Sequence, residues 1–425
     1  MTNHDVSQQK QTNKPRVFYG YILVAAAVAI QIVAWGIHNT YGVFFNPLLD
    51  EFGWSRATIS GAMSLSAIMV GLGAILLGNL NDRFGPRILM TFCGILAGLG
   101  YLLMSQVHSV WQLYLFHGAI VGIGVSGTDV VLLSTTAKWF IKRRGMMSGI
   151  VKMGTGVGMV IAPLVSVWLI SVYGWRTSYV IIGIALAICV VLCAQLLRRD
   201  PAQMQQLPDG EETGNTAYTG PIEVGLSLRQ VTHTRQFWML CFAYLTIFFC
   251  AGTVLIHIAP HVVDLGFSAS FAATIIAMIG GASIIGRFVM GLTGDKIGSK
   301  RALLICFIIL IATLSSLQLA VGSLTLSLFG LAYGFCHGGF FALISPTVAE
   351  FFGTRYHGLI LGIVIFSGSV GGSIGPLVTG HIFDITASYQ VAFLLLLSLA
   401  ITGFILILSS GAVEPKRWLD IAKQL

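Results

Sequence analysis

Charged residues are scarce in this chain of 425 residues, since Asp, Glu, Lys and Arg together make up 9% of it. Soluble domains carry about 25% charged residues, so a chain of this length with so little charge cannot cover a surface that faces water. Hydrophobic residues make up 56%. These proportions exclude a soluble protein and indicate that lipid is the main solvent of the folded chain.

Sequence motifs of soluble enzymes are also missing. The chain contains no GxSxG, no HExxH and no P-loop, and its seven cysteines form no CxxC pair. Each cysteine falls within an apolar stretch, where we expect it to be a small core residue. We therefore expect no enzymatic activity, no cofactor and no bound metal.

Long apolar runs dominate instead. Each is about 20 residues or longer, which is enough for a helix to cross a hydrocarbon core of about 30 Å. Hydrocarbon offers the backbone no hydrogen-bond partner, so these runs must be helical. Twelve runs occur, at residues 18–44, 57–79, 88–106, 110–137, 146–171, 177–197, 237–260, 269–293, 302–320, 324–349, 357–382 and 389–410. The sequence predicts an all-α membrane protein with twelve transmembrane helices.

Basic residues gather on one side of these predicted spans. When alternate loops are counted, 20 of the 24 Lys and Arg fall on the side of the N-terminus, and the opposite side holds Arg56 and Arg176. Cytoplasmic loops carry such an excess, which explains the net charge of +8 without nucleic acid as a partner. We expect both termini to be cytoplasmic and the protein to be a multi-pass protein of the cell (inner) membrane.

The chain repeats a pattern at a constant offset of 213 residues. Residues 78–87 (GNLNDRFGPR) recur as 291–300 (GLTGDKIGSK), and Gly145 recurs as Gly358. Transporters built from two parallel repeats bind substrate between the repeats, near the midplane of the membrane. The predicted parts are a disordered cytoplasmic tail (1–15), a six-helix half (16–197), a flexible cytoplasmic linker (198–235), a second six-helix half (236–412) and a cytoplasmic tail (413–425).

The repeated segment G-x-x-x-D-R/K-x-G-x-R/K resembles the loop signature of the major facilitator superfamily, which lies between spans 2 and 3 and again between spans 8 and 9. The resemblance covers nearly the whole chain. It implies a cytoplasmic gate that stabilises an outward-open state, and a protein that works as a monomer. The residues of this expected gate are Asp82, Arg83, Arg87, Asp295, Lys296 and Lys300. Solvated turn charges are the alternative interpretation.

Three further segments are similar to the monocarboxylate porter family. They are residues 138–149 (KWFIKRRGMMSG), residues 41–47 (YGVFFNP) and residues 286–291 (GRFVMG). That family moves small carboxylates such as lactate and pyruvate, commonly with a proton, and relatives exchange oxalate for formate. The last segment matches the family's buried arginine, which implies a substrate role for Arg287.

Arg287 and Lys152 are the two basic residues that fall inside predicted spans. A basic residue at membrane depth costs about 2.5–3.5 kcal/mol on insertion scales, so it needs a function or a partner. Arg287 lies near the midplane, and its planar guanidinium matches a carboxylate with two parallel hydrogen bonds without giving up its proton. We expect it to bind substrate; a structural ion pair is the alternative.

Lys152 lies at a depth similar to that of Asp129, because their spans are antiparallel neighbours joined by a short loop. The sequence therefore predicts an intramembrane ion pair between them. Both positions depart from the monocarboxylate pattern, where uncharged residues are expected. The alternative is that Lys152 faces the cavity and binds a second carboxylate.

The proton carrier is harder to assign. Animal members of the family place an acid one turn before the arginine and a lysine in span 1, and Ser283 and Asn39 stand there in this chain. The candidates are His257, His337 and Asp129. Histidine suits a carrier that must load and release a proton, because it titrates near neutral pH. A hydrogen-bonded core histidine is the alternative, and it is the favoured interpretation of His38, His117 and His381.

Other side chains from spans 1, 10 and 11 are expected to line the substrate site. They are Asn39, Tyr41, Tyr333, His337, Phe341 and Ser367. The predicted function is proton-coupled transport of a small monocarboxylate by alternating access, and exchange of small dicarboxylates is the alternative. A non-transporting sensor is disfavoured because the linker and the C-terminal tail are too short to form a soluble domain.

Overall fold

The computed structural model describes residues 18–210, 225–318 and 322–411, so the predicted tails 1–15 and 413–425 lie outside it. The first half of the chain forms α1 Tyr19–His38, α2 Tyr41–Phe52, α3 Arg56–Phe84, α4 Pro86–Met104, α5 Val110–Leu113, the π-helix η1 Tyr114–Val121, α6 Gly122–Trp139 and α7 Arg144–Gln195. The second half forms α8 Leu228–Thr232, α9 Arg235–Asp264, α10 Ala269–Ile297, α11 Ser299–Leu317, α12 Ser323–Phe352, α13 His357–Thr386 and α14 Gln390–Ser409.

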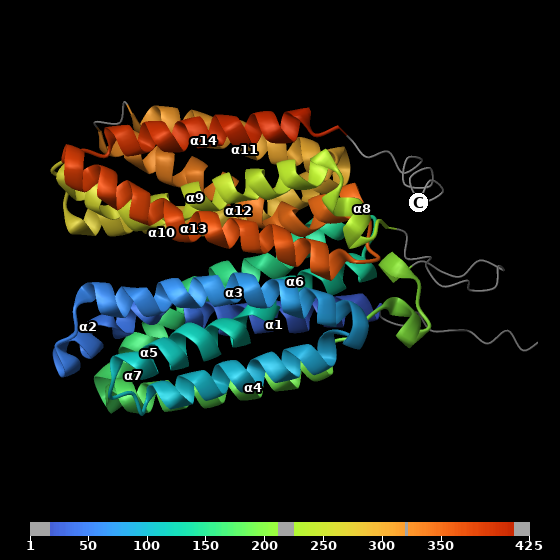
Figure 1. The fold of residues 1–425 in the computed structure, drawn as a ribbon, viewed down its shortest axis with the longest axis horizontal. Coiled ribbons are helices and arrows are strands. Elements are labelled where there is room, and N and C mark those ends of the chain that lie inside the picture. The colour runs from blue at the N-terminus through green and yellow to red at the C-terminus, as the bar shows by residue number, and fades with distance from the viewer. Residues whose placement is uncertain (1–17, 211–224, 319–321, 412–425) are drawn as a thin grey trace, which may run out of the picture.

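The helices form two bundles that lie side by side (Figure 1). The N-terminal bundle contains α1 to α7 and the C-terminal bundle contains α9 to α14. The bundles meet where α3 packs on α13 and α7 packs on α10. Since the 213-residue repeat maps α3 onto α10 and α7 onto α13, these two interfaces are equivalent by internal symmetry.

Eleven helices in the described part of the chain are long and apolar enough to cross a membrane. One of them, α7, has 52 residues, and a straight helix of that length would measure roughly 78 Å. Its backbone leaves helical geometry at Gly174, where φ is 73° and ψ is 164°, a region that glycine enters without a steric penalty. The two arms of α7 therefore pack on different partners, the first on α1 and the second on α4.

The first predicted span, 18–44, agrees with the candidate span Tyr19–Val43. Within it α1 gives way to α2, where the Asn39 side chain donates to the backbone oxygen of Trp35 at 2.7 Å. The second predicted span differs from the structure, because it is predicted to end at residue 79 but continues to Phe84. Its polar last turn is compatible with a helix because the Asn81 amide donates to Ser134 Oγ at 2.9 Å.

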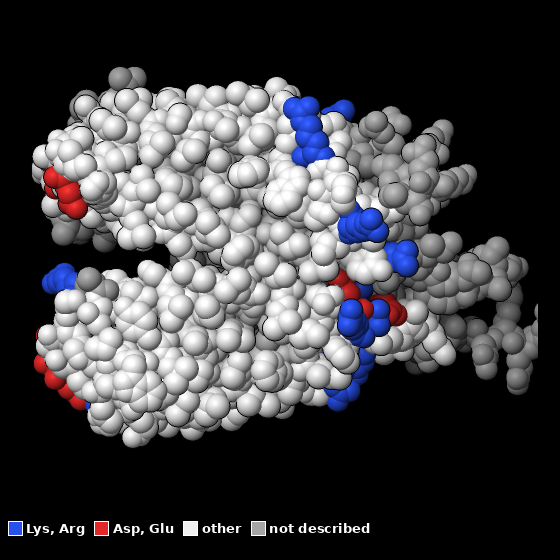
Figure 2. Space-filling view, viewed as in Figure 1, with Lys and Arg blue, Asp and Glu red and all other residues white. Residues whose placement is uncertain are grey.

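Charge is distributed unequally over the surface. Lys and Arg gather at one end of the molecule, and the long sides carry almost none in this view (Figure 2). We call this end the basic end. The last turn of α3 brings Arg83 to it, the last turn of α6 brings Lys138, and Arg198 and Lys300 follow the ends of α7 and α10. The chain also exposes many large apolar side chains, such as Leu164, Leu192 and Leu324, as expected for surfaces in contact with lipid.

The described parts of the linker contact the two bundles. Residues 198–210 fold back on the N-terminal bundle, where the Asp209 carboxylate accepts hydrogen bonds from the backbone of Ile141 and Lys142, both at 2.9 Å. On the other side, Gly225 forms a β-bridge with Gly353. Backbone groups near the bundle ends therefore contact both described parts of the linker, and residues 211–224 lie outside the described ranges.

Glycine permits the close crossing of α1 and the first arm of α7. A Cβ on Gly158 would clash with the backbone oxygen of Ile32 and lie 2.9 Å from Gly36 Cα. Substitution of Gly158 by Ala should therefore force the helices apart and destabilise the protein by about 1–3 kcal/mol, as overpacking does. Thermal unfolding of the purified protein in detergent measures the effect.

Gly280→Ala is the matched control, because a Cβ there meets nothing within 4 Å. Alanine is more favourable than glycine inside a helix by about 1 kcal/mol, so this variant should unfold at the wild-type temperature or above. Equal unfolding temperatures for the two variants would contradict the packing argument.

Candidate functional site

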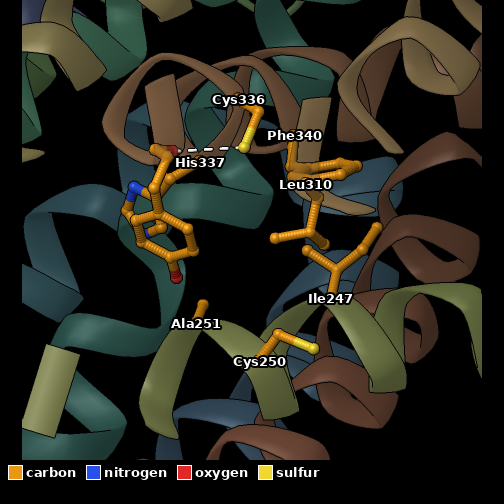
Figure 3. Close-up of a pocket in the computed structure, with 8 residues that line it drawn as sticks. Ile247, Cys250, Ala251, Leu310, Cys336, His337 and Phe340 are labelled. Carbon is orange, nitrogen blue, oxygen red and sulfur yellow. Dashed lines mark hydrogen bonds between the residues drawn. The ribbon is translucent and has the colours of Figure 1, made fainter. Parts of the chain in front are cut away.

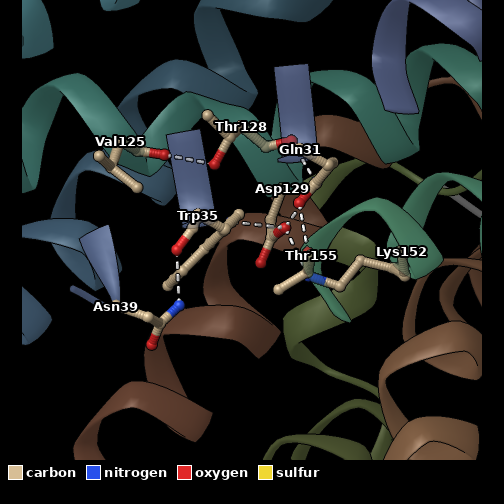
Figure 4. Close-up of polar contacts among 8 residues, drawn as sticks. All are labelled: Gln31, Trp35, Asn39, Val125, Thr128, Asp129, Lys152 and Thr155. Carbon is tan, nitrogen blue, oxygen red and sulfur yellow. Dashed lines mark hydrogen bonds and ion pairs between the residues drawn. The ribbon is translucent and has the colours of Figure 1, made fainter. Parts of the chain in front are cut away.

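An ion pair lies inside the N-terminal bundle. Lys152 Nζ is 2.7 Å from Asp129 Oδ1, and the same oxygen accepts hydrogen bonds from Gln31 Nε2 at 2.9 Å and Trp35 Nε1 at 3.1 Å (Figure 4). The Lys152 side chain is 3% exposed, whereas that of Asp129 is 16% exposed. The carboxylate thus has one oxygen saturated by three donors and still reaches accessible space.

Three helices hold this pair in place. Gln31 and Trp35 are four residues apart and therefore lie on one face of α1. Thr155, on α7, donates to Gln31 Oε1 at 2.6 Å, and Gln31 Nε2 also reaches the backbone oxygen of Thr128 on α6 at 3.0 Å. Every polar atom of the Gln31 amide is used, so α1, α6 and α7 share one hydrogen-bond network at membrane depth.

Arg287 enters the same region from the C-terminal bundle. It is 2% exposed, and its Nη1 donates to the neutral hydroxyl of Ser283 at 2.8 Å. Gly156 of α7 leaves room for the guanidinium, since a Cβ there would lie 2.6 Å from Arg287 Nη1. The guanidinium therefore lies at the contact between the bundles, where its charge interacts with those of Asp129 and Lys152.

The guanidinium retains hydrogen-bonding capacity. Within the described residues, Arg287 Nε is buried without a hydrogen-bond partner. A buried donor without a partner is costly, at about 1–3 kcal/mol. A carboxylate bound beside Nε and Nη2, which point to the same side of the guanidinium, would remove this cost.

Aromatic rings surround the ammonium group. Lys152 Nζ lies 5.5 Å from the ring centre of Trp35 and 5.6 Å from that of Phe341, both within cation–π range. Phe341 comes from α12 and packs on His337 at 4.9 Å and on Phe248 at 4.8 Å between ring centres. The predicted site residues His337 and Phe341 therefore lie beside Lys152, on the opposite bundle.

A cleft of about 530 Å³ opens between the bundles at the end opposite the basic end. Its position is visible as the gap at the left of Figure 2, and we call this end the open end. Three predicted site residues, Asn39, Tyr41 and His257, lie in its wall. The other lining residues are Gly42, Phe45, Ser60, Met63, Ser64, Ala67, Ile256, Gly372, Ser373, Pro376 and Leu377.

The polar groups of these wall residues already have partners. The Tyr41 hydroxyl donates to the backbone oxygen of Ile59 at 2.8 Å. His257 Nε2 lies 3.0 Å from the backbone oxygen of Pro376, and Nδ1 lies 3.3 Å from the Tyr389 hydroxyl. A carbonyl only accepts, so Nε2 carries the ring proton and Nδ1 accepts from tyrosine. This arrangement suits a wall histidine that is held in place.

A charged cluster stabilises the open end of the N-terminal bundle. Glu51 accepts hydrogen bonds from Arg176 Nη2 and Trp175 Nε1, both at 2.7 Å. The hydrogen bond from Arg176 is the main reason that the pKa of Glu51 lies below its ordinary value. Arg176 also donates to the backbone oxygen of Ser105 at 2.6 Å, so these charges connect α2, α4 and α7 and leave the cleft uncharged.

Two predicted lining residues lie elsewhere. Tyr333 is 1% exposed and borders a closed cavity of about 10 Å³ inside the C-terminal bundle, together with residues such as Cys250, Cys336 and His337 (Figure 3). The Ser367 hydroxyl donates to the backbone oxygen of Cys241 at 2.6 Å. Tyr333 therefore contributes to bundle packing, and Ser367 joins α13 to α9.

Acidic residues close the basic end across the two bundles. Asp295 of α10 accepts from the backbone N–H groups of Gly145 at 2.6 Å and Met146 at 2.8 Å, in the first turn of α7. Asp82 of α3 accepts from Leu359 N at 3.3 Å, in the first turn of α13. A helix N-terminus carries a partial positive charge. Each carboxylate therefore attracts the first turn of a helix in the opposite bundle.

The basic members of the expected gate have a different role. Arg87 Nε donates to Gln195 at 2.8 Å within the N-terminal bundle, and Lys300 Nζ donates to the backbone oxygens of Leu408 and Ser410 within the C-terminal bundle. Arg83 and Lys296 are exposed. These four residues therefore do not form the cross-bundle contacts described for Asp82 and Asp295.

Sequence reasoning missed several residues of this region. Gln31, Trp35 and Thr155 complete the network around Asp129. At the basic end, Lys138 Nζ lies 3.6 Å from Asp82 Oδ1. A glutamine inside an apolar run was the available signal, because a buried amide needs partners. The identity of those partners depends on how α1 packs on α6 and α7.

Comparison with known proteins identifies the class. The family model of the Major Facilitator Superfamily matches residues 23–332 and 263–423, and the chain belongs to this superfamily. Its fold is similar to that of FucP in the outward conformation, with a TM-score of 0.69 at 16% identity over 92% of this chain and 99% of that one. The protein is thus a multi-pass membrane transporter.

Sequence relatives narrow the family. The chain is 28% identical to monocarboxylate transporter 13 of Rattus norvegicus over 95% of its length and 90% of the relative. It is 26% identical to the oxalate:formate antiporter of Oxalobacter formigenes over 100% of its length and 98% of the relative. These relatives confirm the predicted resemblance to the monocarboxylate porter family.

Removal of one partner of the ion pair should be more harmful than removal of both. Asp129→Asn leaves Lys152 buried without its counter-charge, which costs about 3–5 kcal/mol for a buried pair. Lys152→Gln removes the cation, and the double variant leaves two neutral amides that can bond to each other. Thermal unfolding of the four proteins in detergent yields the coupling energy. Additive effects would show that the pair does not stabilise the protein.

Neutralisation of Asp295 should weaken closure of the basic end. A charge at a helix N-terminus contributes about 0.3–1 kcal/mol. Asp295→Asn should therefore lower the population of the conformation that is closed at the basic end and open at the other by up to about fivefold. The alkylation rate of Ser64→Cys, a position exposed in the cleft, measures this population.

Asp264→Asn is the control for this experiment. Asp264 is exposed and is the last residue of α9, a helix whose first residue, Arg235, is the last residue of the predicted linker. It should leave the alkylation rate unchanged. An unchanged rate in Asp295→Asn as well would contradict a gating role for this carboxylate.

Proposed function

We propose that this transporter moves a small monocarboxylate together with a proton across the cell (inner) membrane. The main support is the arrangement of buried charge at the interface of the bundles. Arg287 comes from one bundle, the Asp129–Lys152 pair comes from the other, and the cleft opens between the bundles. Intramembrane ionisable residues in such a position are typical of substrate and proton pathways.

Arg287 is the proposed primary substrate ligand. A guanidinium binds a carboxylate with two parallel hydrogen bonds, and its Nε is a buried donor without a partner in the described residues. Lys152 is the second cation, and it is neutralised by Asp129. These three groups carry a net charge of +1, which one monocarboxylate balances.

Asp129 is the proposed proton carrier. When its carboxylate takes up a proton it no longer neutralises Lys152, and the ammonium can then turn to the substrate. Loss of the proton returns Lys152 to Asp129 and weakens substrate binding. Proton and substrate therefore load and leave together, and the site carries the same net charge when it is empty and when both are bound.

The conformational cycle follows from the same geometry. The excess of Lys and Arg at the basic end supports a cytoplasmic location for that end, with twelve crossings if the two arms of α7 count separately, and with both termini inside. The open cleft then faces outward, and Asp82 and Asp295 hold the cytoplasmic side closed. Rocking of the bundles around the midplane site would release these contacts and open the other side. A monomer suffices for this cycle.

Exchange of small dicarboxylates is the second candidate. Two cations at one interface suit two carboxylates, and one relative is an oxalate:formate antiporter. In this case Lys152 binds substrate in every cycle and no proton is required. An internal counter-anion, instead of a proton gradient, would drive uptake.

Uptake of labelled lactate into proteoliposomes with an imposed inward proton gradient tests the proposal. Arg287→Lys keeps the charge but removes the planar pair of donors, and loss of a buried charged contact costs about 2–5 kcal/mol. We expect gradient-driven uptake in the wild type and a loss of about 30-fold or more in the variant. Arg301→Lys, at an exposed position of α11, should behave as the wild type.

The outcomes separate the candidates. Uptake that requires internal formate and ignores the proton gradient would favour exchange. A folded wild-type protein that transports neither lactate nor oxalate would contradict both candidates.

A further inference from the structure

A second group of ionisable side chains is buried in the N-terminal bundle, towards the open end. We define the His–Tyr cluster as His38, Tyr41, Tyr101, His117 and Tyr179. The ring of His117 stacks on Tyr41 at 4.1 Å and on His38 at 5.8 Å between ring centres, and its edge meets Tyr101 at 6.2 Å. Tyr179 stacks on Tyr101 at 6.1 Å. The five residues come from five structural elements: α1, α2, α4, η1 and α7.

The cluster contains an unusual number of polar atoms without partners. In the described residues, both ring nitrogens of His117, Nδ1 of His38 and the hydroxyls of Tyr101 and Tyr179 are buried and make no hydrogen bond. These four residues are each at most 2% exposed. A buried polar atom without a partner is destabilising, and buried polar atoms of this kind are normally satisfied by ordered water. The sequence-based expectation is that His38 and His117 are hydrogen-bonded core residues. Within the described part of the chain, however, no protein group bonds to His38 Nδ1 or to either ring nitrogen of His117.

The backbone that carries His117 is also unusual. Residues Tyr114–Val121 form the π-helix η1, between α5 and α6. A π-helix is rare and often marks a functional site. Its wider turn places His117 among Tyr41, Tyr101 and His38.

The cluster lies between the cleft and Asp129. On one side Tyr41 borders the cleft and stacks on His117. On the other side the ring of His38 meets Trp35 edge to face at 5.4 Å, and Trp35 Nε1 donates to Asp129 at 3.1 Å (Figure 4). A continuous series of contacts therefore joins the cleft wall to the carboxylate.

We propose that the His–Tyr cluster encloses ordered water and takes up the transported proton from the cleft on its way to Asp129. This inference rests on the proton coupling proposed above. A neutral imidazole accepts a proton at one nitrogen and releases the other proton from the second nitrogen. His117 has both nitrogens available for this exchange, and the tyrosine hydroxyls orient the water. In each step a hydronium ion gives one proton to a neutral imidazole and becomes water, and the resulting imidazolium gives the proton on its other nitrogen to the next water; the last hydronium ion protonates the Asp129 carboxylate.

Titratable groups face the cluster from several elements. His117 interacts with His38, Tyr179 interacts with Tyr41 and Tyr101, and Tyr41 interacts with Tyr114. These groups come from α1, α2, α4, η1 and α7. Charged groups border the cluster on two sides: the Glu51–Arg176 pair beside Trp175, which packs on Tyr179 at 6.0 Å between ring centres, and Asp129 beyond Trp35.

Two transport modes separate this role from a structural one. Counterflow exchanges labelled for unlabelled substrate and does not require the proton to leave the protein, whereas gradient-driven accumulation does. His117→Phe should retain counterflow but reduce proton-driven uptake by about 100-fold, the low end of what a positioned proton-transfer group contributes. Tyr101→Phe removes only a hydroxyl and should reduce proton-driven uptake by a smaller factor. Tyr244→Phe, at a fully buried tyrosine of the C-terminal bundle, is the matched control and should change neither mode.

The hydration of the cluster is tested independently by hydroxyl-radical footprinting of the wild-type protein. Radicals form at bound water, so Tyr101 and Tyr179 should be oxidised faster than the equally buried Tyr244. Equal and slow oxidation of all three would overturn the hydrated cluster.

The transport result has two distinct ways to fail. If the wild type shows proton-driven uptake and His117→Phe retains it in full, the relay is wrong and the proposed coupling stands. If the wild type shows none, the proposed coupling is wrong and the relay falls with it.

Discussion

The inability of hydrocarbon to solvate charge governs this structure. Arg287, Lys152 and Asp129 lie at the contact between two bundles, because there each can find another charged or polar group. The same constraint leaves the lipid-facing sides almost free of charge (Figure 2). A charge buried at an interface is stable only while its partners remain, so a change in any partner is felt by both bundles.

This dependence connects the midplane to the basic end. The backbone oxygen of Arg287 lies against Gly149 of α7, and two turns further along α10 Asp295 holds the first residues of the same helix. Asp295, an expected gate residue, and Arg287, the proposed substrate ligand, are therefore both on α10 and both contact α7. Movement of α7 against α10 would alter both, and glycine at this crossing keeps the surfaces smooth enough to slide.

Some parts of this arrangement can be predicted from the sequence and others cannot. The contact between Asp129 and Lys152 could be anticipated, since a short loop between antiparallel helices fixes their relative depth. Tyr333 could not be placed, because the face of α12 that meets the interface depends on packing against α9 and α11. Likewise, periodicity gives no sign of the π-helix at Tyr114–Val121, because most of its residues are apolar and would fit a helix with any number of residues per turn.

The donors around Asp129 suggest why coupling would be strict. Lys152, Gln31 and Trp35 all bind Oδ1, and together they stabilise the ionised carboxylate. A proton can bind the other oxygen, Oδ2, and the neutral acid then holds the donors at Oδ1 less strongly. Lys152 is the donor whose release exposes a new positive charge. Gln31 is tied to Thr155 and Thr128, and the Trp35 ring is packed on His38. The lysine is the donor left free to move, so in the proposed mechanism protonation of Asp129 and binding of a carboxylate would be one event.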